Sequence, residues 1–276
     1  MIKTLVATTS MAALAFVAMP AAAQDWSGFY VGGHAGYTNP SQDRDERILF
    51  DTNLNGAFAD SVRTTTGVDA FGPGFCDGTP NGNNAGAGCS ADDDGNGEYG
   101  VRAGYDYQMG GVVFGVVGEW TSTSLEDAVT GFSTTPASYT FSRDVDSIAA
   151  VRGRVGLDMG SWLPYVTAGY AVAQVDQSYS TSNTANSFTP TSSDGDADGW
   201  QAGAGVDKRL TDNITIGVEY LYSDLDVNDQ LVVRTGAGSA PATNPFLIAN
   251  PAGTDQIRSN DTIRLHALRV TAAYRF

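Results

Sequence analysis

The most constraining feature of this sequence is a set of eight segments in which polarity alternates at every second residue, joined by links that are short and long in strict turn. Such period-2 alternation is typical of β-strands with two different faces, and no stretch of useful length has a helical period. The segments are residues 28–38, 98–109, 112–123, 146–159, 163–176, 198–210, 214–226 and 262–276.

The links between these segments indicate how the strands are arranged. Three are tight, near Gly110, Ser161 and Asp212, as in hairpins. The long links are residues 39–97, 124–145, 177–197 and 227–261. Barrels of the bacterial outer membrane have an even strand number, short periplasmic turns and long extracellular loops. The sequence therefore predicts an all-β fold, an eight-stranded antiparallel transmembrane up-and-down β-barrel with long extracellular loops and both termini periplasmic.

The first residues have the pattern of an export signal. Lys3 precedes a mostly apolar run at residues 4–19, and residues 21–23 offer an A-x-A cleavage site. The run is short for a membrane-spanning helix, which needs ~20 residues. We expect cleavage after Ala23, a barrel domain at residues 24–276, and a final location in the outer membrane of the cell.

The two faces of the expected strands favour a membrane barrel over a soluble one. In residues 112–121, Phe114 and Trp120 share an apolar face, whereas Glu119 lies on the opposite face. In a soluble barrel the apolar face points inward, and nothing in this chain remains to cover an apolar outer face. The apolar faces are therefore expected to contact lipid. For residues 163–176, either face is compatible with lipid.

The polar faces are expected to fill the barrel. An eight-stranded barrel is just wide enough for its interior side chains, and buried charges persist only when they are paired. We therefore expect a salt-bridge network that closes the lumen, and a structural role in envelope integrity and surface display. A small porin that passes ions or small hydrophilic solutes is the alternative. The predicted lumen residues are Arg102, Asp106, Glu119, Arg152, Arg154, Asp207, Glu219 and Arg269.

Cys76 and Cys89 are the two cysteines of the chain, and both lie in one segment rich in glycine, asparagine and aspartate. Export takes them to an oxidising compartment, where a disulfide is favoured over free thiols. A metal site is disfavoured because neither His34 nor His266 is nearby in the sequence.

Two loop segments, residues 92–97 and 194–199, fit the first half of an EF-hand calcium loop. Ala103 and Gly205 stand where the bidentate glutamate belongs, which excludes a complete EF-hand. A flexible acidic turn is the favoured interpretation, and a site that binds Ca²⁺ or Mg²⁺ weakly is the alternative. We expect no other cofactor. The candidate oxygen ligands are Asp92, Asp94, Asn96, Asp194, Asp196 and Asp198.

Charge and histidine content argue against two other classes of function. The net charge of −16 disfavours nucleic acid as a partner, because phosphate contacts need basic surface. By strand parity, His34 faces the lumen and His266 faces the lipid or the rim, so the two do not form one catalytic site. We expect that the protein is not an enzyme.

Three strings resemble the small outer-membrane β-barrel family of alphaproteobacteria (the Omp25/Omp31-like, porin-family proteins). They are DWSGFYVGGHAGY at residues 25–37, GAGVDKRLTDNITIGVEYLYSDL at residues 203–225, and LRVTAAYRF at the end. The resemblance implies that Tyr274 and Phe276 belong to a signal read by the outer-membrane assembly machinery. The long loops do not share the resemblance. For a structural surface barrel, we expect lipid, lipopolysaccharide and a host or environmental surface as partners.

Overall fold

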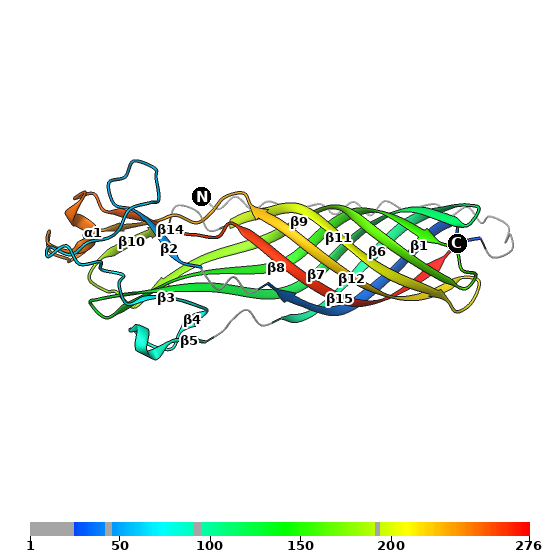
Figure 1. Cartoon of the computed structure of the whole chain (residues 1–276), viewed down its shortest axis with the longest axis horizontal. Helices are drawn as coiled ribbons and strands as arrows, with labels where there is room; N and C mark the ends of the chain where they lie inside the picture. The colour runs from blue at the N-terminus through cyan, green and yellow to red at the C-terminus, as the bar shows by residue number, and fades with distance from the viewer. Residues whose placement is uncertain (1–24, 42–45, 91–94, 191–193) are drawn as a thin grey trace, which may run out of the picture.

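Eight long strands close into a ring, each antiparallel to both neighbours (Figure 1). The computed structural model describes residues 25–41, 46–90, 95–190 and 194–276. Around the ring the order is β7-β6-β1-β15-β12-β11-β9-β8, and β8 pairs with β7 again. The strands are β1 Gly28–Pro40, β6 Asn96–Met109, β7 Val112–Ser133, β8 Ala137–Leu157, β9 Trp162–Thr181, β11 Asp194–Arg209, β12 Ile214–Val227 and β15 Thr262–Arg275.

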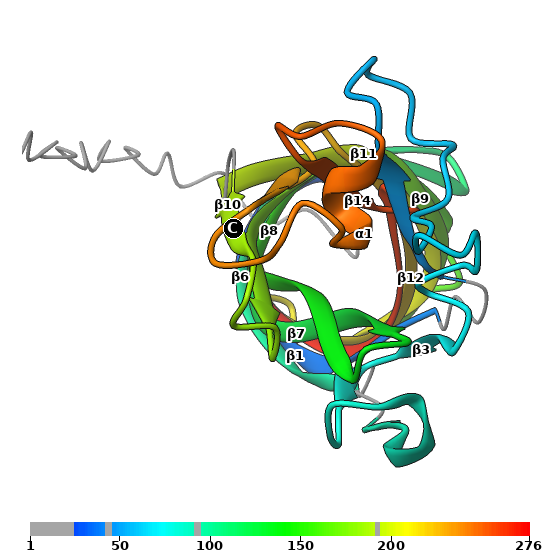
Figure 2. The same ribbon diagram turned by 90° about the vertical axis from the view of Figure 1, so that its left-hand side faces the viewer.

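This arrangement confirms the predicted eight-stranded up-and-down barrel. The tight turns at residues 110–111, 158–161 and 210–213 lie at the same end as Phe276, which we call the short-turn end (Figure 1). The remaining connections lie at the opposite, long-loop end (Figure 2). No helix among the residues described here is long and apolar enough to span a membrane.

The outer face of the ring is apolar between two bands of exposed aromatic side chains, which is the pattern of a membrane-embedded barrel. Near the short-turn end the band contains Phe29, Tyr107, Trp162, Tyr274 and Phe276. Near the long-loop end it contains Tyr37, Tyr99, Trp120, Tyr170 and Trp200. In β9, Val166 and Tyr170 point outward and Thr167 and Ala171 inward, which decides the parity that the sequence left open.

Two expected loops are partly strand, which corrects the sequence-based boundaries. β7 and β8 continue through residues 124–145 to a tight turn, and β9 and β11 enter residues 177–197 from both sides. In β8 the register shifts between Val145 and Ser147, so Arg152 points inward from an even position and Arg143 from an odd one. A prediction that assumes one constant alternation along the whole segment does not recognise such a strand. The reason is that a bulge moves every later side chain to the other face.

The chain beyond the aromatic band at the long-loop end forms a folded head (Figure 1). We use this name for residues 41, 46–90, 124–145, 176–190 and 228–261. A second sheet of order β10-β13-β14-β2 joins three of the connections, and β3 pairs with β7. The elements of the head are β2 Ile48–Asp51, β3 Gly74–Asp77, β4 Thr79–Pro80, η1 Ala85–Ala87, β5 Cys89–Ser90, β10 Ser187–Pro190, β13 Val233–Gly236, α1 Pro245–Ile248 and β14 Thr254–Arg258.

Aromatic packing holds the head together. Phe71 packs against Phe50 with ring centroids 4.5 Å apart and against Tyr139 at 5.1 Å. Phe246 of α1 lies 5.7 Å from Tyr139. Because these rings come from three different connections, their burial ties the long links to one another and to the β7–β8 hairpin.

Candidate functional site

The interior of the barrel holds two clusters of paired charges. We call the one in mid-barrel the Glu219 cluster; its members are Glu98, Arg102, Glu119, Arg152, Glu219 and Arg269. We call the one toward the short-turn end the Asp106 cluster; its members are Asp106, Arg154, Asp207 and Arg275. Each cluster contains as many arginines as carboxylates, and all ten side chains are buried. The buried charge is therefore balanced within each cluster.

In the Glu219 cluster each carboxylate contacts more than one donor. The Arg152 guanidinium donates to Glu119 Oε2 at 2.8 Å and to Glu219 Oε2 at 3.2 Å. Arg269 donates to Glu119 Oε1 at 2.7 Å, and the Tyr165 hydroxyl donates to Glu219 Oε1 at 2.9 Å. Glu219 thus accepts hydrogen bonds from donors on three other strands. These contacts hold the strands at fixed positions around the lumen, and the side chains fill it.

The Asp106 cluster closes the barrel toward the short-turn end. Arg154 donates to Asp106 Oδ1 at 2.8 Å and to Asp207 at 2.9 Å, and Arg275 also pairs with Asp106. Arg154 and Arg275 each lie 5.0 Å from the centre of the Tyr30 ring. The cluster therefore combines ion pairs with cation–π contacts in a space that aromatic rings help to fill.

Inward glycines provide the space for these large side chains. A Cβ placed on Gly104 would lie 2.4 Å from the Tyr30 ring, and one on Gly205 would lie 2.6 Å from the Tyr165 hydroxyl. Both distances are too short for real contacts. The glycine richness of the inner face is thus linked to the packing of the charge clusters.

All eight residues predicted from strand parity lie on the inner face and take part in these clusters. Two members were missed, Glu98 and Arg275. Glu98 shares the inward parity of Arg102, and Arg275 shares that of Arg269, so the same rule carried to the ends of both strands would have found them.

Toward the head, the inner face turns from charged to apolar. A layer of buried aliphatic side chains from six strands, including Leu125, Ile148, Ala173, Leu225 and Leu265, crosses the barrel beyond the Glu219 cluster. The expectation of a polar interior throughout is therefore corrected: only part of the lumen follows it. An apolar constriction is a barrier to ions because it does not replace their hydration shells.

A third group of paired charges lies above this apolar layer and joins the head to the barrel. Arg258 of β14 donates to Glu46 at 2.6 Å and to Asp127 of β7 at 2.5 Å, and Arg143 of β8 donates to Asp127 at 2.7 Å. Burial raises the pKa of the Glu46 carboxyl, although the nearby Arg258 charge lowers it in part. Glu46 is thus expected to take up a proton at higher pH than an exposed glutamate.

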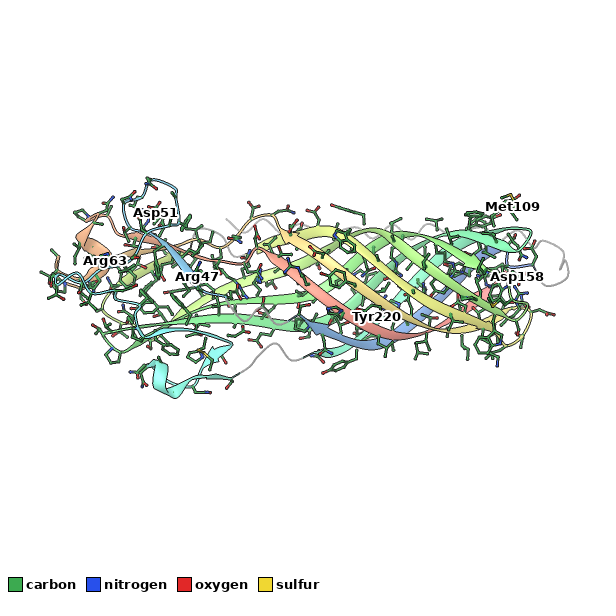
Figure 3. All side chains as sticks on the ribbon, in the orientation of Figure 1. Arg47, Asp51, Arg63, Met109, Asp158 and Tyr220 are labelled. Atoms are coloured by element: carbon green, nitrogen blue, oxygen red, sulfur yellow. A yellow bond between two sulfur atoms is a disulfide. The ribbon has the colours of Figure 1, made fainter. Side chains whose placement is uncertain are left out.

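Trp26 blocks the short-turn end of the barrel. Its side chain is fully buried beside Val113 and Leu163. Its indole N–H donates to Asp158 at 3.2 Å, at the end of the molecule where Asp158 is labelled (Figure 3). The guanidinium of Arg209 lies 4.3 Å from its ring centre. Trp26, which lies just before β1, therefore occupies the mouth of the barrel.

The two histidines lie on opposite faces of the wall. His34 is buried, and its Nε2 lies 3.0 Å from the Thr121 hydroxyl. His266 is exposed on the outer face, where its Nδ1 lies 2.6 Å from the hydroxyl of Tyr220. Tyr220 is labelled on the barrel wall in Figure 3. The barrel wall separates them, and they do not share a site.

Of the six candidate cation ligands, three have side chains that the structure describes, and each of these has different surroundings. Asp92 and Asp94 lie outside the described residues, and Asp194 is described in its backbone alone. The Asp198 carboxylate accepts hydrogen bonds of 2.6 Å from Tyr170 and from Asn228. Asn96 uses its amide to donate to the Ser124 carbonyl at 2.8 Å, and Asp196 is exposed on β11.

A different trio of carboxylates comes together instead. Oxygens of Glu46, Asp77 and Asp127 lie within 4.8 Å of one another. Arg258 pairs with both Glu46 and Asp127, so a cation there would have to displace its guanidinium. The sequence did not single out this trio, because its members come from separate segments.

Cys76 and Cys89 form a disulfide with a Cα–Cα distance of 6.0 Å. The bond closes the small ribbon of β4, η1 and β5, which lies at the side of the head (Figure 2). Tyr274 and Phe276, the expected assembly signal, point outward at the short-turn end with ring centroids 5.1 Å apart.

Reduction of this disulfide is expected to loosen residues 78–90 and leave the barrel intact. A crosslink over a loop of this length contributes ~3 kcal/mol by restricting the open chain, and neither cysteine belongs to one of the eight strands of the ring. Limited digestion with proteinase K, read by mass spectrometry, should cut the ribbon faster after reduction. Equal cleavage of the oxidised and reduced forms would contradict this expectation.

These features define a class of protein: a membrane-embedded β-barrel of eight strands whose interior is filled by its own side chains. A family model described as the outer membrane protein beta-barrel domain matches residues 8–276, and the chain belongs to this family. Its location is the outer membrane.

Similar proteins place the chain among alphaproteobacterial outer-membrane proteins, as the sequence strings indicated. It is 34% identical over 129 residues to the 22 kDa outer membrane protein of Rhizobium leguminosarum bv. viciae, covering 47% of this chain and 53% of that one. It is 27% identical to the 31 kDa outer-membrane immunogenic protein of Brucella melitensis, covering 81% and 84%. The chain thus spans only about half of the Rhizobium protein.

Solved structures add a weaker likeness. The outer membrane protein OprG from Pseudomonas aeruginosa superposes over 91% of this chain and 97% of its own, with a TM-score of 0.45 and 13% identity. At this level of similarity, the comparison carries no argument about function.

Proposed function

We propose that this protein is a structural barrel of the outer membrane, which displays its folded head at the cell surface and contributes to envelope integrity. The observation that carries the proposal is the filling of the barrel. Trp26, two balanced charge clusters and an apolar layer follow one another along its axis. A pore for solutes needs a continuous polar path, and this sequence of barriers interrupts it.

The proposal includes an orientation. The short-turn end, with Phe276, faces the periplasm, and the head faces outward, as is general for barrels with one set of short turns and one set of long loops. Lipid and lipopolysaccharide then contact the apolar outer face and the aromatic bands. The exposure of Tyr274 and Phe276 supports the proposal that the assembly machinery binds the chain at this end.

Conductance separates this proposal from the alternative of a small porin. Refolded protein in a planar bilayer is expected to give no stable stepwise currents, because ions would have to cross the apolar layer without water. A general porin in the same bilayer controls for sensitivity, and heat-modifiable migration on a gel controls for folding. Reproducible current steps of uniform size would refute the closed barrel and favour the porin.

A further inference from the structure

A cavity of about 250 Å³ opens in the head, where all the connections at the long-loop end meet. Phe71 comes from the β1–β6 connection and Thr135 from the β7–β8 turn. Thr184 comes from the β9–β11 connection, and Phe246 comes from α1 between β12 and β15. A site built from every connection exists only when the whole head is folded.

The chemistry of this cavity differs from that of the rest of the molecule. The chain carries a net charge of −16. The cavity lining, taken over the residues that the structure describes, contains hydroxyl, amide and apolar side chains and no formal charge. An ionic ligand would therefore find no counter-charge to replace its lost hydration.

The inner wall of the cavity is held rigidly. Asn183 donates to the Tyr139 hydroxyl at 2.9 Å and to Asn186 at 3.0 Å. Asn244 donates to Asn186 at 3.1 Å and accepts from the backbone N–H of Phe246 at 3.1 Å. These bonds link the β9–β11 connection to α1 and fix the amide groups before any ligand arrives, which lowers the entropic cost of binding.

Hydrogen-bonding groups at the rim remain available for a ligand. Thr135 and Thr184 are exposed, and within the described part of the chain their hydroxyls have no hydrogen-bond partner. Phe71, Pro245 and Phe246 add apolar surface to the same wall. A purely apolar ligand would leave the two threonine hydroxyls without their water, which is unfavourable.

From these constraints we infer that the head cavity binds a neutral pyranose saccharide. A pyranose ring carries hydroxyls around its edge that can bond the threonine hydroxyls at the rim, and apolar C–H faces that can pack against the aromatic side. The cavity lies just below the roughly 300 Å³ at which pockets for drug-sized ligands begin, so it accommodates one sugar unit of a longer glycan.

Saturation-transfer NMR on the detergent-folded full chain tests the inference. The probes are the methyl pyranosides of glucose, galactose, mannose, N-acetylglucosamine, fucose and rhamnose, with glucuronic acid and cyclohexanol as charged and apolar comparators. At least one neutral pyranoside should receive saturation and the two comparators should not. No transfer to any of the six, or stronger transfer to a comparator, would overturn the inference.

Matched variants locate the binding. Thr184→Trp fills the mouth of the cavity and should abolish the signal. Thr189→Trp places the same ring at an exposed position of β10 outside the cavity and should preserve it. Thr135→Val combined with Thr184→Val should weaken binding by roughly tenfold, because two hydroxyl partners are lost while the shape is kept. Equal binding by both tryptophan variants would place the sugar elsewhere and refute the site.

The glycan could belong to the cell's own lipopolysaccharide or to another surface, and the same probe separates these sources. If purified lipopolysaccharide displaces the pyranoside, the ligand is on the protein's own membrane; if it does not, a foreign glycan is indicated, and both results support the site. The inference rests on the proposed function only for placing the head outside the cell. Conductance and binding are measured independently, so either can fail alone.

Discussion

Replacing Glu219 by glutamine is expected to lower the free energy of unfolding by about 3–5 kcal/mol, because it leaves a buried positive charge without its partner. Glu219 is 1% exposed and pairs with Arg102 at 3.3 Å and with Arg152 at 3.2 Å. Glutamine keeps the size of the side chain and removes only the charge. Urea unfolding of the protein in lipid vesicles, followed by tryptophan fluorescence, measures the change.

Two further variants make this result specific. Asp176→Asn removes one carboxylate from an exposed position of β9 and should change stability by no more than about 0.5 kcal/mol. Arg102→Gln combined with Glu219→Gln restores the charge balance, so the double variant should lose less than the sum of the single losses. Strict additivity, or a loss for Asp176→Asn as large as that for Glu219→Gln, would show that the cluster does not act through charge pairing.

Replacing Trp26 by alanine is expected to destabilise the protein by about 3–5 kcal/mol, the usual cost of emptying a buried tryptophan site. The substitution removes the contacts of the ring with Val113 and Leu163 and the cation–π contacts with Arg209 and Arg275. The charge clusters and the apolar layer remain in place, so the barrel should stay closed to ions. Unfolding in urea measures the first effect and planar-bilayer recording the second.

Trp200 provides the control for this prediction. It is 50% exposed on the outer face, in the aromatic band near the long-loop end. Alanine there removes a contact with lipid rather than a packed core, so the loss should be clearly smaller. Currents through Trp26→Ala would mean that the short-turn mouth is the main barrier, which contradicts the interior filling proposed above.

The charge clusters show which interior residues can be predicted from the sequence. Inward parity selects Arg154 and Asp106 because a strand alternates strictly between its faces, and the same rule extends to Glu98 and Arg275. It does not select Glu46, which pairs with Arg258 across 212 positions of sequence. Glu46 lies outside any periodic segment, so only its position in the folded head brings it to its partner.

The strand extensions mark a second limit. In residues 128–132 and 137–141 both faces of the strands are buried: apolar Val129 and Phe141 pack on one face, and Thr130 and Thr140 are buried on the other, unlike the membrane-embedded part, whose outer face is exposed. A search of the sequence for strands with a lipid-facing apolar side therefore predicts a loop at residues 124–145. The register shift between Val145 and Ser147 adds a change of parity that no fixed period describes.

The sequence by itself determined the number and order of the barrel strands and the faces of all of them except β9, because these depend on local alternation and on turns between neighbours in the chain. The tertiary structure decided which charges pair, where the apolar layer lies, and that the long links fold into a head with an uncharged cavity. Those features join residues far apart in the chain, and their energies come from contacts that exist only after the ring has closed.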